Sequence, residues 1–339
     1  MRMYGSRAGR EPVKTRGGVV RRLAAGLLVA AAGALPGPGA AQPAAAPATA
    51  PALRPQPVLP GVWMVQGESA LGSPANRNFI SNAGFVVTPA GVVVIDALGS
   101  PALARELLDA IARITPLPVK ALVVTHYHAD HIYGLQVFKE RGVELIAHEA
   151  GRLYLNSDTA QLRLQASREE LAPWIDAQTR LVAADRWISG PLRLELGGMV
   201  FEVLPAGPAH TPEDLVVALP QQGLLFAGDL VFRGRIPFVG QADSGRWVQA
   251  LDRLLAMNLQ TIVPGHGPVS REAVDDLRLT RDYLQHLRST MAEAARNLEP
   301  FDEAYARADW SRFEHLPLFR AANRINAYNT YLLMERSPP

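Results

Sequence analysis

The chain has 339 residues, 48% of them hydrophobic, which allows one large domain or two small ones with a sizeable core, and its lack of cysteine excludes a fold stapled by disulfides. Residues 1–41 contribute +6 to the formal net charge of +2, so residues 42–339 carry −4. This mildly acidic remainder has no electrostatic reason to bind nucleic acid, and we expect no nucleic-acid partner.

The first 41 residues have the pattern of a secretory signal peptide. Seven basic residues precede the apolar run 23–35, and Gly39 and Ala41 then stand at the spacing of a signal-peptidase cleavage site. The apolar run is too short to span a membrane. We therefore expect an exported protein, periplasmic or secreted; an uncleaved membrane anchor is the alternative.

Residues 42–57 are rich in alanine and proline, which predicts a semi-rigid linker. The folded domain is then expected over residues 58–270. Residues 271–339 are expected to form a helical C-terminal extension packed on that domain, either as a cap or as a wall of a substrate pocket or a dimer face.

Strand and helix patterns alternate between residues 58 and 270. Apolar runs bounded by turn residues predict strands over 61–66, 80–88, 91–96, 121–124, 144–147, 192–196, 199–204, 215–219, 224–226 and 261–263. Amphipathic spacing predicts helices over 100–114, 133–141 and 244–256, a polar helical insert over 149–180, and further helices over 270–298 and 301–336. Such alternation is typical of sheets covered by helices.

Three histidines and an aspartate are concentrated in residues 125–131, which read Thr-His-Tyr-His-Ala-Asp-His. Imidazoles and carboxylates are costly to hold together unless something coordinates them, and a pair of divalent metal ions is the simplest candidate. In an extended segment His126 and His128 share a side and can bind one metal. Asp130 and His131 are adjacent and must diverge, so they can serve a second metal as the chain turns into a helix.

Three later residues offer further metal ligands. His210 lies in Gly-Pro-Ala-His, Asp229 follows Gly228, and His266 lies in Pro-Gly-His-Gly. Each comes after a short apolar run and a glycine, which is typical of a strand end that turns sharply toward a common point. We therefore expect these three residues to join the cluster at residues 126–131.

These segments resemble the metallo-β-lactamase superfamily of binuclear zinc hydrolases over roughly residues 58–270. The resemblance implies an α/β fold, a four-layer αββα sandwich with a helical C-terminal extension and the site at one edge. It implies that the first Zn²⁺ is held by His126, His128 and His210. The second would be held by Asp130, His131 and His266, with Asp229 bridging the two ions.

Within the superfamily, the set of histidines and aspartates is similar to that of glyoxalase II-like hydrolases. The absence of cysteine excludes the cysteine-using lactamase subclasses, and Asp229 argues against antibiotic hydrolysis as the native role. The layout also resembles, more loosely, a SoxH-like group linked to sulfur oxidation or periplasmic quinoproteins. That resemblance implies a small-molecule substrate and a partner in a periplasmic redox system.

The resemblance implies a hydrolase in which a metal-bridging hydroxide attacks an electrophilic carbonyl in a thioester-like or lactam-like bond. Asp130 is the candidate catalytic residue, because it would bind metal and also orient the hydroxide. Residues with expected supporting roles are Asp214 and Asp96, each as an acceptor for an imidazole, and Tyr127, which either faces the substrate or packs. Arginines in two loops are candidate substrate contacts, namely Arg77, Arg233 and Arg235.

Three other functions stay open from the sequence. A mononuclear iron persulfide dioxygenase would use His126, His210 and Asp229. A β-lactamase would use the whole metal set, and a non-catalytic accessory protein would only bind metal. The sequence specifies neither the physiological substrate nor the oligomeric state.

Overall fold

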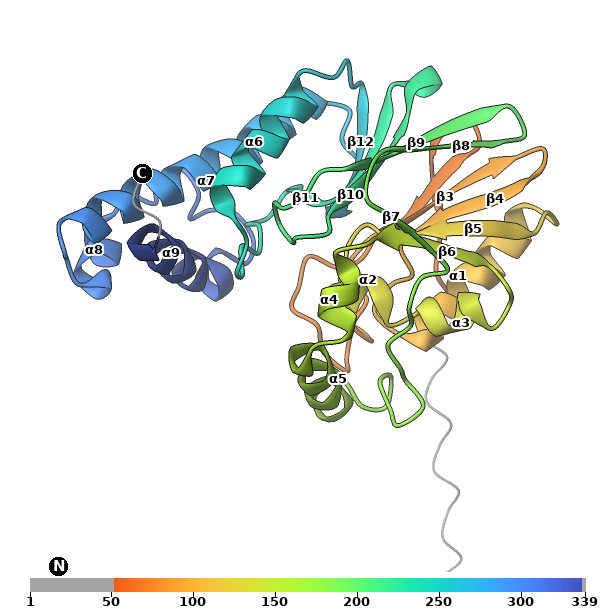
Figure 1. The fold of residues 1–339 in the computed structure, drawn as a ribbon, viewed down its shortest axis with the longest axis horizontal. Coiled ribbons are helices and arrows are strands. Elements are labelled where there is room, and N and C mark those ends of the chain that lie inside the picture. Colours follow the sequence, from red (N-terminus) through yellow and green to blue (C-terminus); the bar gives the residue numbers. More distant parts are fainter. Residues whose placement is uncertain (1–51, 337–339) are drawn as a thin grey trace, which may run out of the picture. The chain divides into compact units, whose positions relative to one another are not determined.

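The computed structural model describes residues 52–336. The predicted signal peptide and the linker up to residue 51 lie outside the described residues. Two β-sheets pack face to face, with helices on their outer faces (Figure 1). No helix within residues 52–336 has the length and apolar character needed to cross a membrane.

The first sheet has seven strands that follow one another in chain order. They are β1 (Gln56–Leu59), β2 (Val62–Val65), β3 (Ala83–Thr88), β4 (Gly91–Ile95), β5 (Val119–Val123), β6 (Glu144–His148) and β7 (Arg186–Ile188). Strands β1 to β4 pair antiparallel, and a turn at Pro89 and Ala90 joins β3 to β4. Strands β4 to β7 pair parallel, and such pairing requires the longer crossovers that connect them.

The second sheet has five strands in the order β12-β11-β10-β9-β8. They are β8 (Leu192–Leu196), β9 (Met199–Pro205), β10 (Leu215–Leu219), β11 (Leu224–Phe232) and β12 (Thr261–His266). Only the pair β11 and β12 is parallel, since helix α6 (Ser244–Leu255) crosses between them. A short 3-10 turn at Pro220–Gln222 leads from β10 to β11.

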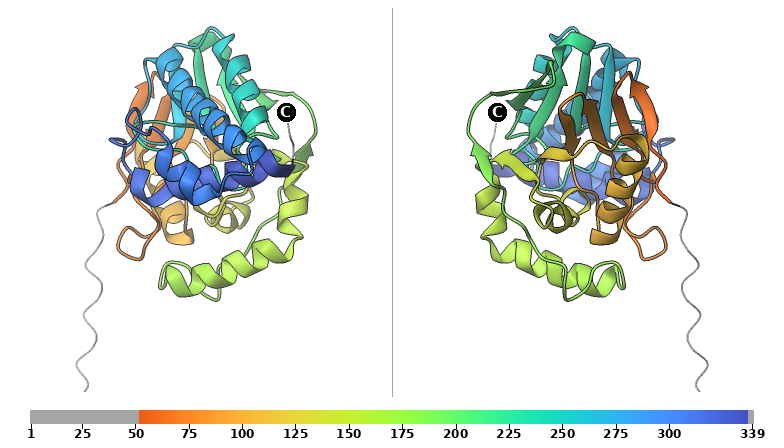
Figure 2. Two further views of the ribbon diagram at one scale, coloured as in Figure 1. Left: turned by 90° about the vertical axis from the view of Figure 1, so that its left-hand side faces the viewer. Right: turned by 90° about the vertical axis from the view of Figure 1, so that its right-hand side faces the viewer.

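Helices complete a four-layer αββα arrangement, as the resemblance implies. Helices α1 (Pro101–Ile114) and α3 (Leu135–Lys139) cover the first sheet, whereas α6 and α7 (Ala273–Arg296) cover the second (Figures 1 and 2). The start of α1 follows the sequence closely: Ser100 Oγ accepts a hydrogen bond from the Leu103 amide, and Pro101 occupies the first turn. The apolar face of α1 is buried against the sheet.

The remaining helices lie in two places. Three helices lie between strands of the first sheet in the chain: α2 (Ala129–Ile132) follows β5, and α4 (Gly151–Leu155) and α5 (Asp158–Glu170) lie between β6 and β7. After residue 270, α8 (Phe301–Arg307) and α9 (Phe319–Arg336) pack against α7. Their buried side chains belong to the same hydrophobic core as the outer face of the second sheet. The helices after residue 270 are therefore continuous with the rest of the fold in their packing.

The structure differs from the predicted elements in four places. Strand β1 begins at Gln56, inside the predicted linker, and the three-residue edge strand β7 was not predicted. The helix expected over 133–141 is shorter, since α3 covers only Leu135–Lys139, and a separate short helix, α2, precedes it at Ala129–Ile132. Strand β11 runs past the predicted end at residue 226 to Phe232, and all nine of its residues are buried, because it lies between the first sheet and the helices that cover the second.

The faces of the two sheets meet closely at Gly84 of β3 and Phe226 of β11. A Cβ atom at Gly84 would lie 2.2 Å from Phe226 Cε1, inside a core made of side chains from both sheets. Interiors are close-packed, so added atoms here must displace the ring or separate the sheets. The absence of a side chain at Gly84 thus fixes the spacing of the two sheets.

We expect Gly84→Ala to lower the free energy of unfolding by about 1–3 kcal/mol, because it overpacks this contact. Chemical denaturation followed by circular dichroism measures the effect. Gly190→Ala is the matched control, since a Cβ there meets nothing within 4 Å. If Gly84→Ala and Gly190→Ala have the same free energy of unfolding, the contact between Gly84 and Phe226 does not limit the spacing of the sheets.

Candidate metal centre

The histidine-rich segment is held at the edge of both sheets. It leaves β5 in an extended conformation, and Ala129 then begins helix α2. The Thr125 amide donates to Asp96 Oδ1 at 2.8 Å on the side of the first sheet. The Thr125 carbonyl accepts from the Leu215 amide at 2.8 Å, at the start of β10 in the second sheet. Both sheets therefore set the position of the imidazoles that follow.

One group of donor atoms is formed by His126, His128, His210 and Asp229. His128 Nδ1 lies 3.2 Å from His126 Nε2 and 3.0 Å from His210 Nε2. Asp229 Oδ2 lies 3.7 Å from His126 Nε2 and 3.4 Å from His210 Nε2. Three imidazoles and one carboxylate thus converge on a single point.

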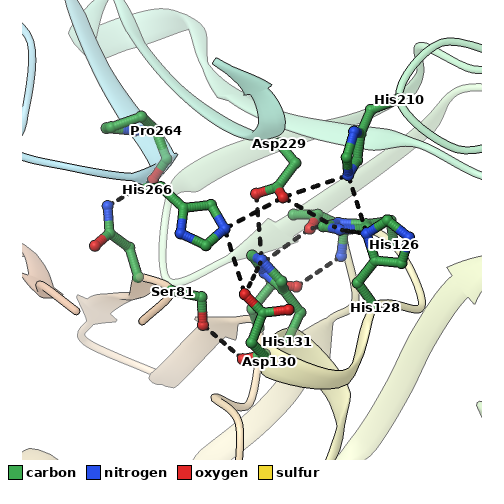
Figure 3. A network of polar contacts seen from close by, with 12 residues as sticks. Ser81, His126, His128, Asp130, His131, His210, Asp229, Pro264 and His266 are labelled. Carbon is green, nitrogen blue, oxygen red and sulfur yellow. Dashed lines mark hydrogen bonds and ion pairs between the residues drawn. The ribbon is translucent and has the colours of Figure 1, made fainter. Parts of the chain in front are cut away.

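A second group is formed by Asp130, His131 and His266, next to the same Asp229. Asp130 Oδ2 lies 3.7 Å from His131 Nε2 and 3.3 Å from His266 Nε2. Asp229 Oδ1 is 3.2 Å from His131 Nε2, and Asp229 Oδ2 is 3.3 Å from His266 Nε2. Figure 3 shows Asp229 between His210 on one side and His266 on the other, in the position expected of a bridging carboxylate.

These distances suit divalent metal ions. A tetrahedral zinc ion with Zn–N distances of about 2.0–2.1 Å keeps its ligand atoms roughly 3.3–3.4 Å apart. In each group the donor atoms lie within 4.8 Å of one another. The Nε2 atom of His131 is buried without a hydrogen-bond partner among the described residues, so it is free to bind a cation. The residues present therefore fit two metal ions that share Asp229.

The protonation states also match metal ligands. Burial, assisted by the neighbouring imidazoles, lowers the pKa of His126 and lowers that of His128 to about 3. Burial alone would raise the pKa of Asp229, but the surrounding histidines, led by His266, outweigh it and hold that pKa below its usual value. Neutral imidazoles and ionised carboxylates are the forms that bind metal.

The histidines of the second group have a raised pKa. Burial alone would lower it, but Asp229 and the other nearby carboxylates outweigh burial at His131 and His266. Metal binding at this group would therefore release protons, because only the neutral rings are ligands.

Two acceptors orient these rings. His131 Nδ1 lies 2.9 Å from Asp96 Oδ2, and His266 Nδ1 lies 2.7 Å from the Ile80 carbonyl oxygen. Each contact fixes Nδ1 as the donor and leaves Nε2 toward the other ligands. The structure thus places Asp96 where the sequence predicted an acceptor for an imidazole.

Gly228 permits the close approach of Asp229 to the histidine segment. Its φ angle is +51°, and a Cβ atom there would lie 2.9 Å from the Thr125 side chain. Gly265 has a similar role for His266, since its Cβ would lie 2.0 Å from Asp229 Oδ1. These contacts explain why Asp229 and His266 each follow a glycine.

Two expected supporting residues have other roles. Asp214 does not orient an imidazole: its two oxygens accept from the Thr211 amide and hydroxyl, each at 2.8 Å, so it fixes the loop after His210. Burial raises the pKa of Asp214 to about 7. Tyr127 packs rather than facing a substrate, because its buried ring stacks on Trp187 with 6.1 Å between ring centroids.

The expected arginine contacts are also partly corrected. Arg77 pairs with Glu106 of α1, and Arg233 Nε pairs with Asp276 of α7 at 2.6 Å. Both guanidinium groups are thus already bound within the protein. Arg235 is different, because it lies beside His266 with 3.4 Å between its Nη1 and Nδ1 of the ring.

One residue of the site had no signal in the sequence. Asn82, at the entry to β3, is buried and donates from Nδ2 to the carbonyls of Pro264 and Gly267, each at 2.8 Å, while its Oδ1 accepts from the Gly67 amide. It therefore ties the loop after β2 to the turn that carries His266. Its partners are up to 185 residues away, so no local pattern reveals it.

Comparisons with known proteins agree with this geometry. Residues 76–266 match the family model described as Metallo-beta-lactamase superfamily. The chain is 30% identical over 213 residues to a "Metallo-beta-lactamase type 2" of Bacillus cereus, covering 61% of this chain and 74% of that protein. It is 27% identical over 239 residues to a "Linear primary-alkylsulfatase" of Pseudomonas sp., covering 60% of this chain and 45% of that protein.

Solved structures are similar as well. A metallo-beta-lactamase from Pontibacter korlensis matches with a TM-score of 0.54 at 27% identity, over 69% of this chain and 99% of that one. A stereoselective inverting sec-alkylsulfatase from Pseudomonas sp. matches with a TM-score of 0.65 at 19% identity, over 83% of this chain and 50% of that one. At that identity the second match shows the fold alone.

We expect Asp96→Asn to weaken zinc binding by the second group roughly 10- to 100-fold. The neutral amide oxygen is a weaker acceptor than the carboxylate for the hydrogen bond from His131 Nδ1. Titration with zinc against a competing chelator measures this affinity. Asp185→Asn removes a carboxylate that pairs with Lys139 away from the site, and should leave the affinity unchanged. Equal zinc affinities in both variants would contradict a supporting role for Asp96.

Proposed function

The chain belongs to the metallo-beta-lactamase superfamily, and from this premise we propose that it is an exported binuclear zinc hydrolase. It would add water to the electrophilic carbonyl of a small molecule and so cleave a thioester-like or lactam-like bond. The observation that carries the proposal is the double ligand set. Seven donor residues form two groups that share one buried carboxylate, Asp229, and each group fits one divalent ion.

Each residue of the set has a defined task in this proposal. His126, His128 and His210 would hold the first ion, and Asp130, His131 and His266 the second, with Asp229 between them. When bound, such ions lower the pKa of a water molecule to about 7 and polarise a substrate carbonyl.

Asp130 is the best placed residue to orient the attacking water. Its side chain is 15% exposed, whereas that of Asp229 is 4% exposed, so Asp130 is the carboxylate of the site that reaches the open side. A carboxylate there accepts a hydrogen bond from the water and directs its lone pair toward the carbonyl. His266, His131 and His126 hold the pKa of Asp229 well below its usual value, so Asp229 stays ionised and has no proton to donate.

Export is proposed from the N-terminal sequence. The basic segment, the apolar run 23–35 and the cleavage-like spacing after it all support a signal peptide. A periplasmic redox system is the proposed setting, on the basis of the SoxH-like resemblance.

Two activities compete with this proposal. A mononuclear iron persulfide dioxygenase would need only His126, His210 and Asp229, whose donor atoms also lie close together. It would leave the second group without a function.

Antibiotic hydrolysis as the main role is supported by the names of several relatives, among them the Bacillus cereus protein. The aspartate at position 229 argues against it.

The first test is the metal content of residues 42–339, purified without added metal or chelator. We expect close to two zinc ions per chain, measured by elemental analysis. About one iron per chain with little zinc would overturn the binuclear proposal and favour the dioxygenase.

The substrates to be tested are thioesters, β-lactams and alkyl sulfates. The last two are included because the chain is similar to a metallo-beta-lactamase and to an alkylsulfatase.

The substitution His131→Ala separates the two chemistries. It removes a ligand of the second group, so a binuclear hydrolase should lose one metal per chain and its hydrolysis should fall to background. A mononuclear dioxygenase would keep its complete ligand set and its oxygen consumption. His148→Ala is the control, because His148 Nδ1 only accepts from the Ala150 amide at the end of β6.

A further inference from the structure

Among residues 52–336, His210 has no hydrogen-bond acceptor of the kind that orients His131 and His266. Its Nε2 atom lies 3.0 Å from His128 Nδ1, in the first group of donor atoms. Its other ring nitrogen, Nδ1, is buried and unpaired in this part of the chain. Since a ligand imidazole has to be held in one orientation, some other contact must fix the ring of His210.

Two aromatic rings contact His210 in place of such an acceptor. Trp247 on α6 meets it edge to face, with 5.0 Å between ring centroids and 63° between ring planes. Phe232, the last residue of β11, meets it in the same way at 5.8 Å and 68°. Edge-to-face pairs at such separations are favourable and have a preferred geometry. The two rings come from different elements, so together they restrict the rotation of the imidazole.

Phe232 also contacts a ligand of the second group. Its ring stacks on His266 with 4.9 Å between centroids and 5° between planes, and the two residues are paired between β11 and β12. His210 and His266 lie on either side of Asp229 (Figure 3). The ring of Trp247, within the described residues, contacts those of His210 and Phe232. One apolar ring therefore contacts a histidine of each group, whereas the other contacts a histidine of the first group alone.

Phe232 and Trp247 are themselves held in place by the core. Phe232 is 2% exposed and Trp247 is fully buried. Trp247 Nε1 donates to the Leu230 carbonyl at 3.2 Å, and the centroids of the two aromatic rings lie 6.4 Å apart. Both side chains belong to the hydrophobic core that the second sheet shares with its helices. Because protein interiors are close-packed, the ring of His210 can turn only if these two rings move as well.

We infer that Phe232 and Trp247 are positioning residues of the metal centre, in which Phe232 holds one histidine of each group and Trp247 holds His210 alone. An apolar shell around a metal site also limits the access of water to the ligands. The two groups of ligands are therefore linked through one side chain that binds no metal. The inference rests on the proposed function only in taking zinc as the ion that the ligands hold.

The test withdraws zinc from the loaded protein with a competing chelator and measures a dissociation constant for each of the two ions. We expect Phe232→Leu to raise both constants roughly 10-fold, because the ring that packs on both histidines is lost. Trp247→Leu should raise only one of them, since its ring contacts a ligand of the first group alone. Wild-type constants in Phe232→Leu would overturn the inference. Equal losses for both ions in the two variants would overturn it as well.

Phe313→Leu is the matched control. Phe313 is 1% exposed in the same hydrophobic core, and its ring lies 5.5 Å from that of His286, which is outside the ligand set. The variant loses the same atoms from the core without touching a ligand, so both zinc constants should keep their wild-type values. If Phe313→Leu weakens zinc binding as much as Phe232→Leu does, a general loss of stability accounts for the effect and the inference is wrong.

Two further measurements separate positioning from stability. Phe232→Met fills much of the space without a flat ring, so it should also weaken both ions and replaces Phe232→Leu if that variant does not fold. The visible absorption of the Co²⁺-loaded protein reports the geometry of the ligands. We expect its bands to shift in both variants of Phe232 and not in Phe313→Leu. Wild-type zinc constants and an unchanged spectrum in Phe232→Met would contradict the inference.

This inference and the proposed function fail in different ways. Wild-type zinc constants in Phe232→Leu, in a protein that hydrolyses its substrate, would keep the hydrolase and reject the positioning role. Zinc binding that depends on Phe232, in a protein that hydrolyses none of the tested substrates, would keep the positioning role and sink the hydrolase.

Discussion

Asp229 lies inside β11 with its carboxylate buried among four imidazoles, at 3.2–3.7 Å from their Nε2 atoms. Burying an ionised carboxylate without a positive charge nearby costs several kcal/mol of desolvation free energy, and contacts with neutral imidazole rings offset only part of that cost. Positive charge at this point, from protonated histidines or from metal ions, is therefore what the arrangement requires. The other ligands can be understood as the groups that surround this one anion.

The layered fold is the means by which distant residues reach Asp229. The histidine segment leaves the first sheet, whereas Asp229 and His266 belong to β11 and β12 of the second. The two sheets must therefore keep a fixed spacing, which close packing between Gly84 and Phe226 sets. Asn82 adds a polar link across the same edge, from the entry of β3 to the turn before and after His266.

The side chains that the structure brings together at the candidate metal centre could be named from the sequence because their signals are local. The histidine segment has its spacing within seven residues, and each later ligand follows an apolar run and a glycine. The role of Arg77 was predicted wrongly because its partner lies 29 residues away in α1. Of the two predicted imidazole acceptors, Asp96 contacts His131, whereas Asp214 accepts from the nearby Thr211. The short edge strands β1 and β7 lack the long apolar runs on which strand prediction depends.

The candidate metal ligands and the loop that carries Arg235 are held in place by different parts of the fold. The ligands come from the sheets and the turns at their edge, whereas the loop with Arg235 is held by Asn326 and by the chain at Pro317. Apolar packing alone would bury this loop in several similar conformations, because such contacts have no direction. Asn326 uses both ends of its amide on the loop backbone and on Tyr283, so one conformation satisfies every partner. A superfamily with constant metal chemistry can change substrate by changing such a loop, since the residues that bind metal need not move.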